Sequence, residues 1–127
     1  MSGPLSGIKI IDLSSVISGP VATVLLADQG ADVIKVEAPQ GDIVRRMGLG
    51  KNNLSPAFVS ANRGKRSICI DLKEPKGLVV VKKLVAEADV FVQNFRPGAI
   101  ERMGLSYDIL SVLNPRLLYV SVSGFGE

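Results

Sequence analysis

The sequence predicts an α/β fold in which a parallel sheet is covered by helices on both faces. Two observations predict it. Short apolar runs typical of strands alternate along the chain with longer segments that have helical spacing. The strand-like runs are also nearly continuous in apolar residues, as expected for parallel strands buried on both faces. With 127 residues, of which 46% are hydrophobic, the chain is expected to form a single domain over residues 1–127.

Five segments are predicted to be strands: residues 8–13, 31–37, 66–72, 89–95 and 117–126, the last of which runs into a glycine-containing loop. Helices are predicted over residues 19–30, 74–88, 97–104 and 106–114, with a short helix near Pro56 inside a long loop. Pro20 suits the first position of the first helix, and Gly30 suits its C-terminal cap. Pro75 and Ser106 mark the starts of two later helices. The chain stops directly after a predicted strand, which we interpret as the mark of a fragment or of a short relative.

Composition excludes several classes of site. Histidine is absent and cysteine occurs once, so the chain offers neither a Ser-His triad nor a transition-metal site. Cys69 lies in the middle of a predicted strand, where a buried and inert thiol is expected. No apolar stretch approaches the length of a membrane span, and the first apolar run lacks the basic start of a secretory leader. We therefore expect a cytoplasmic protein without disulfides, metal or membrane contact.

Positive charge is concentrated in one part of the chain. Residues 35–83 carry 11 of the 15 Lys and Arg but only 4 of the 12 Asp and Glu, a local net charge of +7. Such an excess is consistent with an anionic ligand, or with a solvated face that keeps the protein soluble. The basic run "NRGKRS" fails the phosphate-loop pattern, and with only 5% aromatic residues the chain offers few platforms for stacking nucleic-acid bases.

Candidate binding residues gather where the predicted strands end, because ligands of parallel sheets bind outside the carboxyl ends of the strands. The turn after the first strand reads "SSVISGPVAT" and has only Gly19 of a dinucleotide fingerprint, although Glu37 lies where a ribose-binding acid is expected. Asp12, Asp71 and Asp89 are expected to cap loops and helix starts. The residues alone therefore indicate an anion-binding half-site without a convincing catalytic group.

Several longer motifs resemble those of the family III coenzyme A transferases and the related alpha-methylacyl-CoA racemases. They are "IIDLSSVISGPVATVLLADQGADVIKVEAPQGD", "NRGKRSICIDLKEPKG" and "ADVFVQNFRPGAIERMGLSYDILSVLNPRLLYVSVSGFGE", which together cover nearly the whole chain. The resemblance implies a Rossmann-like sheet that is part of a larger domain. It also implies coenzyme A or an acyl-CoA thioester as a substrate rather than as a permanently bound cofactor.

The resemblance assigns binding roles to eight residues. The loop after the first strand, which lines the CoA and active-site region in the family, falls on Val16, Ile17 and Ser18. The remaining positions are the adenine neighbourhood at Ile70 and Lys73, and the pantetheine and phosphate region at Asn94, Phe95 and Arg102. The chain departs from some family members at Ser15, Ile17 and Ala38, which puts contacts to the carboxylic acid and to the nucleotide in question.

In family transferases an aspartate attacks the acyl-CoA, and the resemblance places that nucleophile beyond Glu127, so no catalytic residue is expected in this chain. The implied partners are a CoA thioester, a small carboxylic acid and a second copy of the chain. Two alternatives stay open: a free-standing CoA-binding or assembly module without catalysis, and a fragment of a racemase.

Overall fold

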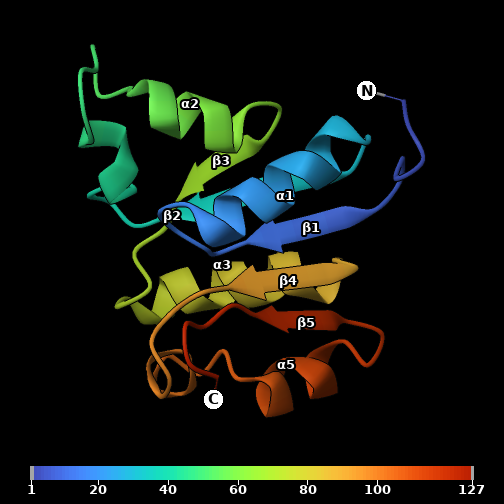
Figure 1. Cartoon of the computed structure of the whole chain (residues 1–127). Coiled ribbons are helices and arrows are strands. Elements are labelled where there is room, and N and C mark those ends of the chain that lie inside the picture. Colours follow the sequence, from blue (N-terminus) through green and yellow to red (C-terminus); the bar gives the residue numbers. More distant parts are fainter. Residues whose placement is uncertain (1, 127) are drawn as a thin grey trace.

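A computed structural model describes residues 2–126, and its centre is a sheet of five parallel strands. The strands are β1 (Lys9–Asp12), β2 (Asp32–Glu37), β3 (Arg66–Cys69), β4 (Val90–Gln93) and β5 (Leu118–Ser121). Their order is β3-β2-β1-β4-β5, and the arrowheads in Figure 1 point to the same edge of the sheet. This is the strand order of a Rossmann-like fold, so the predicted α/β class is confirmed.

Helices cover both faces of the sheet (Figure 1). On one face α1 (Ser18–Asp28) packs against β1, β2 and the shorter α2 (Pro56–Asn62). The other face carries α3 (Pro75–Ala86), α4 (Ala99–Arg102) and α5 (Tyr107–Leu113). The long loop between β2 and α2 contains a 3-10 helix, η1 (Ile43–Arg46), which the sequence pattern did not predict.

Each face of the sheet has its own apolar core, because successive side chains of a strand point to opposite sides. Ile10 and Val33 pack with Ala27 of α1 on one face. Ile11 and Phe91 lie on the other face, in a larger core shared with α3, α4 and α5. The sheet is therefore rigidly supported from both sides, and the loops at its carboxyl edge rest on that support.

The two edge strands are less buried than the three central ones. β3 has a neighbour only in β2, and most of its residues are exposed. Cys69, opposite Glu37 in the register, is exposed. The prediction of a buried thiol is therefore wrong, because it assumed a central strand. Leu118 and Val120 of β5 are also exposed, at the opposite edge of the sheet.

Predicted and observed elements differ mainly at their carboxyl ends. The third strand ends at Cys69 rather than at residue 72, because Asp71 begins a turn in which its backbone oxygen accepts from the N–H of Glu74. The fifth strand ends at Ser121 rather than at residue 126. The short helix expected near Pro56 is present as α2, with Ser55 as its cap. Within residues 2–126 no helix is long and apolar enough to cross a bilayer.

Candidate functional site

A cleft of about 390 Å³ opens at the carboxyl edge of the sheet. Ser14 and Ser15 after β1, Glu37 at the end of β2, Lys73 after β3 and Phe95 after β4 all line it. Four strands thus contribute to one cleft, at the edge where ligands bind in open parallel sheets.

The first half of the loop between β1 and α1 is fixed by side chains at the end of β1, within β2 and directly after β4. The carboxylate of Asp12 accepts from the N–H of Ser14 at 2.9 Å. The buried ammonium of Lys35 donates to the carbonyl of Ser14 at 3.0 Å. The amide of Asn94 accepts from the N–H of Ser15 at 2.9 Å and donates to its carbonyl at 2.7 Å. Asn94 therefore joins β4 to the loop after β1.

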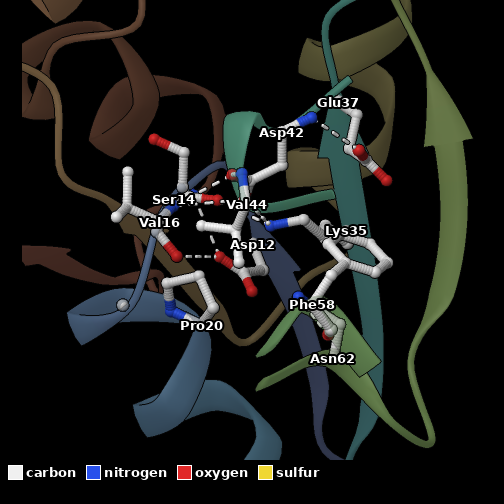
Figure 2. A network of polar contacts seen from close by, with 12 residues as sticks. Asp12, Ser14, Val16, Pro20, Lys35, Glu37, Asp42, Val44, Phe58 and Asn62 are labelled. Carbon is white, nitrogen blue, oxygen red and sulfur yellow. Dashed lines mark hydrogen bonds and ion pairs between the residues drawn. The ribbon is translucent and has the colours of Figure 1, made fainter. Parts of the chain in front are cut away.

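The next residue of this loop, Val16, has a left-handed backbone with φ of 67°. This region is unfavourable for a β-branched residue. The N–H of Val16 lies 3.2 Å from each carboxylate oxygen of Asp42. The same carboxylate is 3.1 Å from the ammonium of Lys35 and accepts from the N–H of Val44 at 3.1 Å, where it caps η1 (Figure 2).

A second buried ion pair lies beneath the loop. The carboxylate of Asp12 is fully buried and lies 2.9 Å from the ammonium of Lys65. It also accepts from the hydroxyl of Thr23 at 2.5 Å and from the hydroxyl of Ser14. Burial lowers the pKa of Lys65, and the charge of Asp12 opposes that shift. Asp12 caps the loop as expected, but its burial beside a lysine was not predicted.

Glu37 is saturated by donors and cannot serve as a free acid. Arg45 binds its two oxygens through Nε at 2.8 Å and Nη2 at 2.6 Å, and the guanidinium lies 3.8 Å from the ring centre of Phe58. Burial alone would raise the pKa of Glu37. The hydrogen bonds from Arg45 and the Asp42 N–H, together with the charges of Arg45 and Lys35, outweigh it and lower the pKa from 4.5 to about 2. The predicted ribose-binding position is therefore an internal salt bridge.

The basic run before β3 is structural. Arg63 pairs with Asp28 at 2.5 Å, and Arg66 pairs with Asp32 at 2.6 Å. Lys65, between them, is the buried partner of Asp12. All three cations have acidic partners in the fold, so much of the local positive charge in the sequence is compensated by acids from other segments. Within residues 2–126 no group of three or more Cys, Asp or Glu is arranged to bind a metal ion.

A second hollow of about 620 Å³ lies beside the cleft, between the loops that follow β4 and β5. Ser18, Asn94 and Phe95 line it together with residues 122–126. Phe95 lines both hollows.

Residues 5–127 match the family model of CoA-transferase family III. The chain belongs to CoA-transferase family III. It is 50% identical to the succinate–glutarate CoA-transferase of Agrobacterium fabrum, over 98% of this chain and 33% of the relative. It is 44% identical to the human succinyl-CoA:glutarate CoA-transferase, over 98% of this chain and 29% of that protein.

Solved structures agree with the family assignment. A CAIB/BAIF family protein from Brucella suis superposes with a TM-score of 0.94 at 42% identity, over 99% of this chain and 35% of the other. The chain thus spans about a third of the length of the family members that it matches.

In this family III chain the eight predicted binding residues divide into three groups. Six of them lie at or beside the two hollows. Lys73 lines the cleft, Ser18 and Asn94 line the second hollow, and Phe95 lines both. Val16 and Ile17 are exposed in the adjoining loop. Ile70, directly after β3, is buried, and only 7% of it is exposed. Arg102 is exposed on α4 and lines neither hollow. Asn94 already donates to and accepts from Ser15, so its structural role in the loop was missed.

Sequence reasoning also missed Lys35, Asp42 and Arg45. One signal for Lys35 was present, since "VIKVE" places a lysine inside an apolar run that reads as a buried strand. A buried lysine requires an acidic partner. The identity of that partner depends on the path of the loop that follows β2.

Proposed function

We propose that this chain is the N-terminal, CoA-binding portion of an enzyme that transfers CoA between carboxylic acids. One observation carries the proposal: a preformed cleft at the carboxyl edge of the sheet, in a chain that matches CoA-transferase family III over residues 5–127. Residues 1–127 would form one Rossmann-like part of a larger domain in a cytoplasmic enzyme. Relatives named as succinate, glutarate, oxalate and malate transferases support the transferase branch over the racemases.

The position of Lys73 supports a role in binding the nucleotide end of CoA. Lys73 lies on the rim of the cleft, is exposed, and forms no ion pair with any residue from 2 to 126. This ammonium group is therefore available to phosphate oxygens. Ile70, buried below it, would support the adenine neighbourhood through packing, and Phe95 would offer an apolar face to the pantetheine arm.

The nucleophile is proposed to lie outside these 127 residues. Three carboxylates line the cleft, those of Glu37, Asp42 and Asp71. Glu37 and Asp42 are each bound by a cation and by backbone N–H groups. Glu37 and Asp42 therefore lack the free lone pairs that attack on a thioester requires. Asp71 forms no ion pair within residues 2–126, and its carboxylate accepts from the N–H of Lys73 in the turn after β3, which supports a capping role. The acyl-CoA, a small carboxylic acid and an aspartate from another part of the protein would complete the reaction.

A second copy of the chain is the proposed protein partner. Val21 and Leu25 of α1 are exposed, as are Leu118 and Val120 at the edge of the sheet. Exposed apolar residues and an unpaired sheet edge favour self-association.

Binding and turnover test the proposal separately. Calorimetry with coenzyme A and the 127-residue chain should detect binding at low salt, which weakens as salt is raised because the ligand is anionic. The absence of binding at low salt would refute the binding role. Incubation with succinyl-CoA and glutarate should give no CoA transfer, and transfer by the purified chain would contradict an external nucleophile.

A further inference from the structure

Val16 lies in a backbone conformation that its own side chain disfavours. Its φ of 67° is left-handed, and its side chain is β-branched. Such a conformer persists only when surrounding contacts determine it. The flanking residue Ser15 is bound by Asn94 on both its N–H and its carbonyl, while Val16 itself offers an N–H to Asp42.

Asp42 reaches this N–H from a different segment, the loop after β2. Both of its carboxylate oxygens lie 3.2 Å from the Val16 nitrogen, and Oδ2 lies 3.1 Å from the Lys35 ammonium. Figure 2 shows the Asp42 side chain between Val16 and Lys35. Lys35 in turn donates to the carbonyl of Ser14. The pair thus contacts the loop at two residues, Ser14 and Val16, on either side of Ser15.

Capping of η1 does not by itself account for this arrangement. A cap needs one acceptor oxygen for one N–H, which Asp42 provides to Val44. The burial of a full ion pair, with side chains at most 2% exposed, has a desolvation cost that a neutral cap would avoid. The additional contacts of the pair are directed at Ser14 and Val16, which precede the residues that face the second hollow.

We propose that Asp42, oriented by Lys35, is a positioning residue that keeps Val16 left-handed and thereby sets the direction of Val16, Ile17 and Ser18 towards bound CoA. This inference rests on the proposed function, because it concerns how the same site is preorganised. Without an acceptor for its N–H, Val16 leaves the left-handed region, and the population of the binding-competent loop falls by about tenfold or more.

Two double variants separate the effect of the acceptor oxygen of Asp42 from the effect of the charges of Lys35 and Asp42. Lys35→Met with Asp42→Asn removes both charges and retains a carbonyl oxygen for Val16 and Val44. Lys35→Met with Asp42→Leu removes the charges and the oxygen together. Each is made with and without Val16→Gly, since glycine adopts a left-handed backbone without steric cost. Calorimetry with coenzyme A gives the affinity, and NMR hydrogen exchange of the residue 16 amide reports on the loop without any ligand.

The Asn variant should retain most of the affinity for CoA and a protected Val16 amide. The Leu variant should bind about tenfold more weakly and exchange that amide faster, and Val16→Gly should recover most of the lost affinity. Wild-type affinity in the Leu variant, or no recovery with Val16→Gly, would overturn the inference. If the Leu variant fails to fold, Lys35→Met with Asp42→Ser replaces it, because serine retains the cap but is too short to reach Val16.

A chain that binds no CoA in any form would refute the proposed function by itself. The exchange measurement then decides the positioning claim separately. Equal exchange of the Val16 amide in wild type and in the Leu variant would show that Asp42 does not fix the loop.

Discussion

The ammonium of Lys35 and the carboxylate of Asp42 lie 3.1 Å apart at the base of the cleft, and neither side chain is more than 2% exposed. Lys35 belongs to β2, and Asp42 belongs to the loop that follows it. A buried pair of this kind adds little net stability relative to apolar residues, but loss of one partner leaves an uncompensated buried charge.

Lys35→Met should therefore destabilise the chain strongly. The unpaired Asp42 carboxylate is expected to cost about 3–5 kcal/mol in the free energy of unfolding, measured by urea denaturation. Lys76→Met on the exposed part of α3 is the matched control and should change stability by less than about 0.5 kcal/mol. Addition of Asp42→Asn to Lys35→Met should recover most of the loss. A Lys35→Met chain as stable as the control would contradict the role given to the pair.

Glu37 should make the free energy of unfolding depend on pH in the acidic range. Its folded pKa of about 2 lies below its ordinary value of 4.5. A lowered pKa means that the stabilisation is fully present above pH 4.5 and is lost as the pH falls towards 2. Its size is roughly 3 kcal/mol. Urea titrations between pH 6 and pH 2.5 should show this loss in wild type and a smaller slope in Glu37→Gln. Parallel pH curves for the two proteins would contradict it.

The fold was predictable because its evidence is local. Continuous apolar runs and helix-start signals such as Pro75 and Ser106 are properties of short segments, and each corresponds to an element of the structure. The order of the strands is not local. Periodicity cannot say that β3 lies at the edge of the sheet, and this is why Cys69 was predicted to be buried.

For the site, the sequence could predict only which residues lie near the carboxyl ends of the strands. Lys73 and Phe95 lie on one cleft because all carboxyl ends of a parallel sheet meet at one edge. The contacts that shape the loop after β1 depend on tertiary structure. The left-handed backbone of Val16 and its contact with Asp42, 26 residues away, follow from the path of a loop whose 3-10 helix had no clear signature.

The exposed position of Cys69 predicts rapid labelling of the folded chain. It is the single cysteine of the sequence, so one equivalent of a maleimide should react without denaturant, and Cys69→Ser should abolish the reaction. The measurement is mass spectrometry of the labelled protein over time. Labelling that requires urea would mean that β3 is covered in solution, for instance by a second copy of the chain.

Lys73→Ala should weaken CoA binding and reduce its dependence on salt, because it removes an exposed positive charge from the rim of the cleft. A solvated ion pair predicts a loss of about two- to fivefold in affinity. Calorimetry at two salt concentrations gives both effects. Lys76→Ala, three residues along on α3 and away from the cleft lining, controls for net charge. Equal effects of the two substitutions would assign the binding to general electrostatic attraction.

Gly19→Ala should disturb the loop between β1 and α1 through a clash with Ser14. A β-carbon at residue 19 would lie 2.2 Å from that of Ser14, which is too close for any real contact. Ser14 is itself fixed by Asp12 and Lys35, so it cannot move without breaking buried hydrogen bonds. The expected cost is about 1–3 kcal/mol of unfolding free energy, measured by urea denaturation, with weaker CoA binding in parallel. Gly124→Ala is the control for stability, because a β-carbon there meets no atom within 4 Å. If the two substitutions proved equally mild, the packing of the loop against the start of α1 would be looser than the distances indicate.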